Sequence, residues 1–434
     1  MKTLIIKRLQ SLARRAVLAQ KPTVIGITGS YGKTSTRQAV AEVLSAGHLS
    51  VRTGEGNYNS EIGFPLSVLG ESSPGRHPFA WLGVLGRARA QIRSKTFPSH
   101  LVLEYGADKR GDIARLCDVV SPTVSVLTGI SPVHAEGIGS LEDIVSEKGE
   151  LARRTMKGGL VMVNADDPYH HALAQNSPSA VQTYGWADFA DVRVSAYAIE
   201  TLSQARFSLE EPVTRMRVEI TTRRSVYDVT LQNVLGKPVA SALAAAVLVG
   251  EHFGLSREDI LVGLQRVRPI SGRLNPLIGI KGSLIIDDSY NASPKAMRAA
   301  LETLSQFALM DNGRRIAVLG HMAELGPYTE SEHQDLGKFV AELGNVDGLL
   351  CVGERARDIA RAARAAGMPG DHVLEFPKTK EAGEWVDGFI HAGDVVLVKG
   401  SQSARMEHVV KAIMAEPLRS EELLVRQSKT WLET

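Results

Sequence analysis

A short glycine-containing segment between an apolar run and a helical pattern has the residues of a phosphate-binding loop. The run TVIGITG (23–29) leads into SYGKTS (30–35) and then into the helical pattern TRQAVAEVLSAG. Backbone amides of such a loop and the N-terminus of the next helix bind phosphate oxygens. Lys33 would reach the terminal phosphates of a nucleotide, and the hydroxyl of Thr34 would bind Mg²⁺. The nucleotide site predicted from this spacing consists of Gly29, Ser30, Gly32, Lys33, Thr34 and Ser35.

The loop departs from the general phosphate-loop pattern at one position. Ile27 stands six residues before Lys33, where the general pattern has its first glycine. A chance Gly-Lys-Thr after a strand is the alternative interpretation, but the full order of strand, loop and helix favours a phosphate site.

Two carboxylates follow apolar runs and could bind a cation or a ligand. Glu104 lies near the end of LVLEYG (101–106), and Asp288 lies near the end of SLIIDDSY (283–290). Ligands of α/β proteins bind at the carboxyl ends of parallel strands, and hard cations prefer carboxylate oxygen. Glu104 is therefore a candidate Mg²⁺ ligand. Asp288 fits a ligand site, or equally the N-cap of the following helix.

The elements that position these residues follow from the hydrophobic pattern. Short apolar runs ending in Gly, Asn or Asp, with helical patterns between several of them, predict buried parallel strands at 23–29, 101–106, 123–130 and 159–167. Alternating segments from 192 to 233 predict a small antiparallel side sheet. Two helical stretches follow near 238–252 and 256–266, and strand and helix then alternate again. We expect an α/β protein with a basic N-terminal helix (1–22), a central phosphate-loop ATPase-like domain (23–270) and a Rossmann-like α/β domain (271–434).

Length, charge and cysteine content exclude several classes of protein. At roughly 100–200 residues per domain, 434 residues suffice for two to four domains. Lys and Arg total 50 against 48 Asp and Glu, so net charge gives no reason to expect a nucleic-acid partner. Cys117 and Cys351 form neither a disulfide framework nor a zinc-ligand pair, which fits a reducing cytoplasm. No apolar run approaches the roughly 20 residues that span a bilayer.

Two basic segments with apolar residues stand apart from the predicted nucleotide site. The first 21 residues contain no acidic residue, and Ile5, Leu9, Leu12 and Ala16 recur at helical spacing. This helix could lie on a membrane at the inner face, or pack on its own domain. Residues 77–95 combine Phe79, Trp81, Leu82 and Leu85 with four basic residues. They could contact a membrane or an anionic, lipid-linked substrate, or form a helical lid over a soluble substrate.

Several segments in order resemble the Mur ligase superfamily of ATP-dependent amide ligases. Thr28–Thr34 is similar to the family's shortened loop T-G-x-x-G-K-T. The other segments resemble the type that adds D-alanyl-D-alanine to UDP-N-acetylmuramoyl tripeptide: GNYNSEIGFPLSVL (56–69), VLEYGADKRGDIARL (102–116), DDSYNASPKAM (287–297), AVLGHMAELG (317–326) and VLVKGSQSARMEHVV (396–410). The resemblance covers about residues 23–415. It implies peptidoglycan precursor synthesis, in which ATP activates a peptide carboxylate as an acyl phosphate and an amine displaces phosphate.

The resemblance also implies roles for single residues. Glu104 and His134 match ligands of a second Mg²⁺ site, and Lys148 matches a lysine that is carbamylated to help hold that metal. Without the family, His134 would be an ordinary loop histidine and Lys148 a solvated helix lysine. Arg273 would reach the ATP phosphates, and Asp288 the ribose hydroxyls. The residues implied to meet the two other substrates, or to adjoin them, are Asn57, Asn59, Ser60, Tyr290, Asn291, Lys399 and Ser401.

Three departures from the family leave the substrates open. Only 22 residues precede the first predicted strand, so the family's UDP-sugar domain is expected to be missing. Gly236–Ser241 lacks both asparagines of the run that holds adenine, and His321 replaces an aspartate. We expect a monomeric ligase that uses ATP, two Mg²⁺ ions, a peptide or UDP-sugar-peptide carboxylate, and an amino acid or dipeptide. The alternatives are a non-catalytic ATP-binding scaffold homologue and a ligase acting on a carboxylate that is not UDP-linked.

Overall fold

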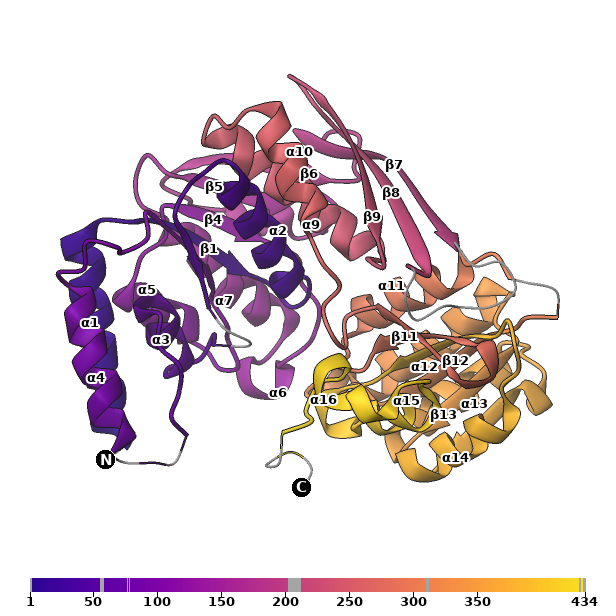
Figure 1. Cartoon of the computed structure of the whole chain (residues 1–434). Coiled ribbons are helices and arrows are strands. Elements are labelled where there is room, and N and C mark those ends of the chain that lie inside the picture. Colours follow the sequence, from indigo (N-terminus) through magenta and orange to yellow (C-terminus); the bar gives the residue numbers. More distant parts are fainter. Residues whose placement is uncertain are drawn as a thin grey trace.

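Two sheets form the framework of the protein (Figure 1). The computed structural model describes residues 2–54, 58–75, 77, 79–201, 212–309, 312–428 and 431. Within the described chain, no helix combines the length and the apolar character needed to cross a bilayer.

The first sheet combines parallel and antiparallel strands. Its described strands, in spatial order, are β2 (Val51–Thr53), β3 (His100–Glu104), β1 (Thr23–Thr28), β4 (Val124–Leu127), β5 (Leu160–Asn164), β6 (Ala180–Gly185), β7 (Val192–Thr201), β8 (Thr214–Thr222) and β9 (Val226–Gln232). Pairing is parallel from β2 through β7, and β7, β8 and β9 pair antiparallel. The predicted antiparallel strands are thus present, but they continue the parallel sheet at its edge, because β6 pairs with β7.

Helices cover both faces of this sheet. Side chains of β1 alternate, so Ile25 and Ile27 enter one core and Val24 enters the other. The first core is closed by α2 (Lys33–Ala46), α9 (Lys237–His252) and α10 (Arg257–Gln265). The second core is closed by α1 (Lys2–Gln20), α3 (Gly63–Leu69), α4 (Ala80–Gln91), α5 (Asp112–Val119), α6 (Ala135–Ile138), α7 (Leu141–Arg153) and α8 (His170–Ala174). The N-terminal segment is therefore a helix packed on its own domain, as one of the two interpretations predicts.

The second sheet carries the C-terminal part of the site. Its order is β10 (Asn275–Ile278), β11 (Leu284–Asp288), β15 (Val395–Lys399), β12 (Arg315–Gly320), β13 (Gly348–Val352) and β14 (Val373–Phe376). All described pairs are parallel except β10 with β11. One face packs on α11 (Pro294–Ser305), α12 (Thr329–Leu343) and α13 (Arg357–Ala365). The other packs on α14 (Thr379–Phe389), α15 (Glu407–Ile413) and α16 (Ser420–Leu423).

The predicted α/β fold class is confirmed, and so are the predicted strands. Strands β2, β6 and β10 were not among the predictions. Glu104 ends β3, while Asp288 and Lys399 end β11 and β15 in the other sheet. All three line one cleft, so the carboxyl ends of both sheets open toward a common space. The domain limits at 22 and 270 remain a prediction.

Candidate active site

The phosphate loop joins β1 to α2. Gly32 adopts a left-handed conformation (φ 78°) directly before the first residue of α2. A side chain at Gly29 would place its Cβ 2.0 Å from Thr128 Oγ1, so glycine is required there. Lys33 Nζ donates to Gly29 O at 2.5 Å, which folds the lysine back over the loop. Burial lowers the pKa of Lys33, and the negative charge of Glu104 opposes that shift.

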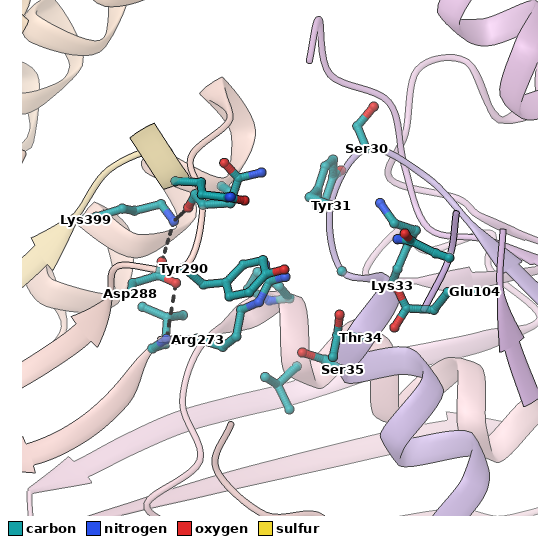
Figure 2. A pocket seen from close by; sticks show the side chains of 18 of the residues that line it. Ser30, Tyr31, Lys33, Thr34, Ser35, Glu104, Arg273, Asp288, Tyr290 and Lys399 are labelled. Atoms are coloured by element: carbon teal, nitrogen blue, oxygen red, sulfur yellow. Dashed lines mark hydrogen bonds and ion pairs between the residues drawn. The ribbon is translucent and has the colours of Figure 1, made fainter. Parts of the chain in front are cut away.

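The loop forms one wall of a cleft between the two sheets (Figure 2). Lys33 and Glu104 lie on one side of the view, and Asp288 and Lys399 on the other, with Arg273 and Tyr290 between them. The lining residues are Ser30, Tyr31, Gly32, Lys33, Thr34, Ser35, Asn59, Glu104, Asp108, His134, Pro238, Val239, Arg273, Leu274, Asp288, Tyr290, Asn291, Ala296, Lys399 and Gln402. The structure thus brings together most of the site residues expected from the sequence.

Glu104 is a buried carboxylate next to a cation. Its Oε1 lies 3.3 Å from Arg37 Nε, and its side chain is 4% exposed. The same oxygen accepts no hydrogen bond from the part of the chain that the structure describes. A buried carboxylate oxygen without a donor is suited to bind a cation.

His134 lies beside two carboxylates, one from each half of the chain. His134 directly precedes α6 and has a φ of 66°. Its Nδ1 lies 2.5 Å from Glu324 Oε2 and 3.6 Å from Asp108 Oδ1. This pair with Glu324 links the first half of the chain to the second.

Lys148 does not line the cleft, but its Nζ contacts Ala107, the residue before Asp108, which does. Its side chain is 1% exposed within α7, so the interpretation as a solvated helix lysine is wrong. Its Nζ has one carbonyl partner, Ala107 O, at 3.4 Å. Burial, and secondly the positive charge of Lys33, lowers the pKa of Lys148 to about 7. A substantial share of this amine is therefore neutral at physiological pH.

Five of the expected residues lie together beside the second sheet: Arg273, Asp288, Tyr290, Asn291 and Lys399. Lys399 Nζ lies 2.7 Å from Asp288 Oδ2 and donates to Asn291 O at 2.9 Å. Asp288 Oδ1 accepts from Leu274 N at 3.3 Å. The Arg273 guanidinium lies 4.0 Å from the centre of the Tyr290 ring. This arrangement holds two cations and an aromatic ring opposite the phosphate loop.

The positions of Asp288 and Ser401 differ from two of the interpretations of the sequence. Asp288 does not cap the helix after it, because the Ser293 side chain accepts from Ala296 N at the start of α11. Ser401 is buried and does not line the cleft. Its N donates to His321 O at 2.9 Å, and its hydroxyl lies 3.2 Å from Ser403 Oγ.

The loop before α3 lines a second hollow beside the cleft. Asn59 lines both spaces, and Ser60 lines the second hollow together with Gln10 of α1, Lys109 and Arg115. Asn57 lies outside the described residues.

The departures from the family pattern have structural counterparts. Pro238 and Val239 give the cleft an apolar wall at the start of α9, and Ser241 accepts a hydrogen bond from Trp186 Nε1 at 3.0 Å. His321 Nε2 lies 2.9 Å from Ser403 Oγ, and burial lowers the pKa of His321 to about 4.

Comparison with known sequences identifies the family. Residues 89–249 match the Mur ligase middle domain, and residues 272–402 match the glutamate ligase domain of Mur ligases. A UDP-N-acetylmuramoyl-tripeptide–D-alanyl-D-alanine ligase of Mycobacterium bovis is 31% identical over 429 residues, which cover 95% of this chain and 76% of that protein. The chain belongs to the Mur ligase family.

Other relatives match almost the whole of this chain and most of their own length. The protein of the same name from Bacillus subtilis is 29% identical over 411 residues, or 94% of this chain and 80% of that one. The crystal structure of the MurF ligase of Thermotoga maritima in complex with ADP superposes with a TM-score of 0.76 at 26% identity. The match covers 96% of this chain and 84% of that structure.

Sequence reasoning missed several residues around the site of this Mur ligase. Arg37 follows Lys33 by one helical turn, so spacing along α2 could have pointed to it. Glu324, which pairs with His134, carries no such signal. The same holds for Lys295, whose Nζ lies 3.0 Å from Asp167 Oδ2 and joins α11 to the first half of the chain.

Proposed function

We propose that this Mur ligase joins D-alanyl-D-alanine, or a similar amine, to the terminal carboxylate of UDP-N-acetylmuramoyl tripeptide, with ATP converted to ADP and phosphate. The observation that carries the proposal is the cleft in which Lys33 and Glu104 face Arg273, Asp288 and Lys399. The names of the relatives from Mycobacterium bovis and Bacillus subtilis support the substrates, and the ADP-bound Thermotoga maritima ligase supports the nucleotide.

The proposed reaction has two steps. An oxygen of the substrate carboxylate attacks the γ-phosphorus of ATP, and ADP leaves. The amine then attacks the acyl carbon, phosphate leaves with that oxygen, and the amine loses a proton to solvent. Both steps concentrate negative charge near the phosphate loop. Lys33 and Arg273, which line the cleft, would stabilise this charge electrostatically.

Mg²⁺ fits the chemistry of the donors at the loop. The hydroxyls of Thr34 and Ser35 line the cleft, and Glu104 presents a buried oxygen without a hydrogen-bond donor. Magnesium is commonly held by one or two protein ligands together with phosphate oxygens and water. When bound, it would neutralise developing phosphate charge. These three residues would hold the first ion, and Glu104 with His134 would contribute to a second.

Lys148 is proposed to complete the second site as a carbamate. Within the described chain, no group of three or more His, Cys, Asp or Glu side chains is arranged to hold a metal. A carbamate on Lys148 would add an anionic oxygen ligand to those of Glu104 and His134. A neutral amine attacks carbon dioxide and releases one proton, which leaves a carbamate anion. The buried Lys148, with a pKa lowered to about 7 by desolvation, supplies such an amine.

The proposed setting is the cytoplasm, at the inner face of the membrane, where the enzyme acts as a monomer on small molecules. Cys117 and Cys351 are buried free thiols, which suits a reducing compartment.

Phosphate release tests the proposed function and its alternatives. The enzyme with ATP and Mg²⁺ is given the UDP-linked tripeptide, peptides without UDP, and several amines including D-alanyl-D-alanine. Release that requires the UDP-linked tripeptide and D-alanyl-D-alanine together supports the proposal. Release with a different carboxylate identifies another acceptor, and nucleotide binding without any release identifies a scaffold.

A further inference from the structure

Helices α1 and α4 form a single layer on the outside of the first domain. They lie side by side (Figure 1), and Gln20 Nε2 at the end of α1 donates to the carbonyls of Gln91, Ile92 and Ser94 at 3.0–3.3 Å. The inner face of the layer packs against the core through Leu9, Ala13, Ala16, Trp81, Val84 and Ala88. We call residues 2–21 and 79–95 the α1–α4 layer. Its inner face is fully used in packing, so any further role belongs to its outer face.

Large apolar side chains are concentrated on that outer face. Phe79 is 84% exposed, Leu82 68%, Leu18 66% and Leu4 60%. These are four of the eleven large apolar side chains that are exposed in the described chain, although the layer holds less than a tenth of the sequence. On α1, the exposed residues recur at spacings of three and four, and form a stripe of Leu4, Lys7, Ser11, Arg14 and Leu18. Packing of the fold does not account for this stripe.

The same face is strongly basic. Sequence segments 1–41 and 72–103 contain no Asp or Glu. Of the exposed basic residues, Arg87 pairs with Glu71 at 2.7 Å. The others form no ion pair within the described chain: Lys7, Arg8, Arg14, Arg15, Lys21, Arg89, Arg93 and Lys95. Because the whole chain carries a net charge of only +2, the excess of positive charge here is local.

We propose that the outer face of the α1–α4 layer docks this enzyme onto an anionic lipid bilayer. Exposed Phe and Leu side chains enter the headgroup region while Lys and Arg bind anionic headgroups, and each basic residue strengthens binding. The alternative of a lid over the substrate finds no support, because no described residue between 77 and 95 lines the cleft. This inference is independent of the ligase reaction and of its substrates.

Vesicle sedimentation tests the docking face with the full chain. Wild-type protein is mixed with vesicles of phosphatidylcholine alone or with added phosphatidylglycerol. We expect sedimentation with the anionic vesicles, and less of it as salt is raised. The variant Arg14→Gln/Arg89→Gln/Arg93→Gln should partition at least about tenfold more weakly. The variant Phe79→Ser/Leu82→Ser should also lose binding, and ligase turnover in solution should stay at the wild-type level for both.

Matched controls carry the same substitutions elsewhere on the surface. Leu418 is 98% exposed in the second half of the chain, and Arg223 and Arg224 are exposed beside the antiparallel strands. Leu418→Ser and Arg223→Gln/Arg224→Gln should bind vesicles like the wild type. Three results would overturn the proposal: no sedimentation with anionic vesicles, equal sedimentation of the α1–α4 variants and the controls, or a dimer in light scattering that becomes a monomer in Phe79→Ser/Leu82→Ser.

Discussion

Arg37 Nε lies 3.3 Å from Glu104 Oε1, with the two side chains 13% and 4% exposed. Arg37 also donates through Nη1 to Gly54 O at 2.7 Å, which fixes its guanidinium against the loop after β2. Lys33 lies one turn earlier on α2, and its charge also acts on Glu104. Two cations of one helix therefore flank a single carboxylate at the end of β3. Arg37 and Lys33 of α2 thus position the phosphate-loop side of the site against the end of β3.

Lys33→Ala should abolish ATP turnover and leave the fold intact. The lysine stabilises developing phosphate charge and belongs to none of the hydrophobic clusters, so we expect turnover to fall by about 10²–10³. Turnover is measured by phosphate release, with circular dichroism as the control for folding. Near-native turnover with an unchanged spectrum would remove the loop from the mechanism.

Lys148→Met should make folding less dependent on pH. Burial lowers the pKa of Lys148 to about 7 in the folded state, whereas the unfolded chain keeps the ordinary value of 10.5. Between these values the unfolded state binds the proton and the folded state does not, so wild-type stability rises with pH. From pH 7 to pH 9 the free energy of unfolding of the wild type should gain about 2 kcal/mol on that of Lys148→Met.

Urea unfolding of both proteins at the two pH values measures this difference. The variant should also lose ligase turnover, because it has no amine to carry a carbamate. An equal pH dependence for the two proteins would show that Lys148 is not protonated differently on folding.

Arg426→Ala should disturb the loop that carries Tyr290. Arg426 is 5% exposed, pairs with Glu407 at 2.9 Å, and donates to the carbonyls of Ser289 and Tyr290. Losing one partner of a buried ion pair costs about 3–5 kcal/mol, and Arg405 remains to pair with Glu407, so we expect a loss at the lower end of that range.

Kinetic measurements separate a role of Arg426 in positioning the Tyr290 loop from a role in stability alone. At a temperature where the variant is folded, KM for ATP should rise several-fold, and Arg426→Lys should recover part of the loss. Arg419→Ala is the matched control. Among the residues that the structure describes, Arg419 forms ion pairs with Glu416 and Glu422 at the surface, and its loss should change stability by at most about 1 kcal/mol. Unchanged KM in Arg426→Ala would show that the C-terminal segment has no influence on the site.

The two halves of the chain should close around their ligands. Lys33 and Thr34 begin α2 beside the first sheet, whereas Asp288 ends β11 of the second sheet and Arg273 lies just before β10. All four nevertheless line one cleft. An ATP analogue, Mg²⁺ and both substrates together should decrease the radius of gyration measured by small-angle scattering. Lys33→Ala, which should bind the nucleotide weakly, serves as the control. A radius that does not change on adding all ligands would contradict closure.

The sequence predicted the strands that hold the catalytic groups better than it predicted their surroundings. Strands β1, β3, β4 and β5 are buried on both faces, so their apolar runs are unambiguous. Strand β6 begins with exposed residues and β10 contains a proline, so neither shows this pattern. Continuity of the antiparallel strands with the parallel sheet depends on the β6–β7 pairing, which alternation along the chain does not reveal.

Prediction of the site from the sequence has the same limit as prediction of the strands: it reaches only what local pattern encodes. Glu104 and Asp288 end strands, and Lys33 and Thr34 begin the helix after β1, so local pattern was enough to select them. The burial of Lys148 and the contacts of Glu324 and Arg426 depend on chain segments more than forty residues away. No periodicity or spacing encodes such contacts, and three-dimensional packing alone establishes them.

The fate of one oxygen atom tests the proposed acyl phosphate most directly. The tripeptide substrate is labelled with ¹⁸O in its terminal carboxylate and incubated with the enzyme, ATP, Mg²⁺ and D-alanyl-D-alanine, and the released phosphate is analysed by mass spectrometry. Attack of the carboxylate on the γ-phosphorus predicts that each phosphate carries one ¹⁸O atom and that the nucleotide product is ADP. Unlabelled phosphate, or label appearing in AMP, would contradict the account.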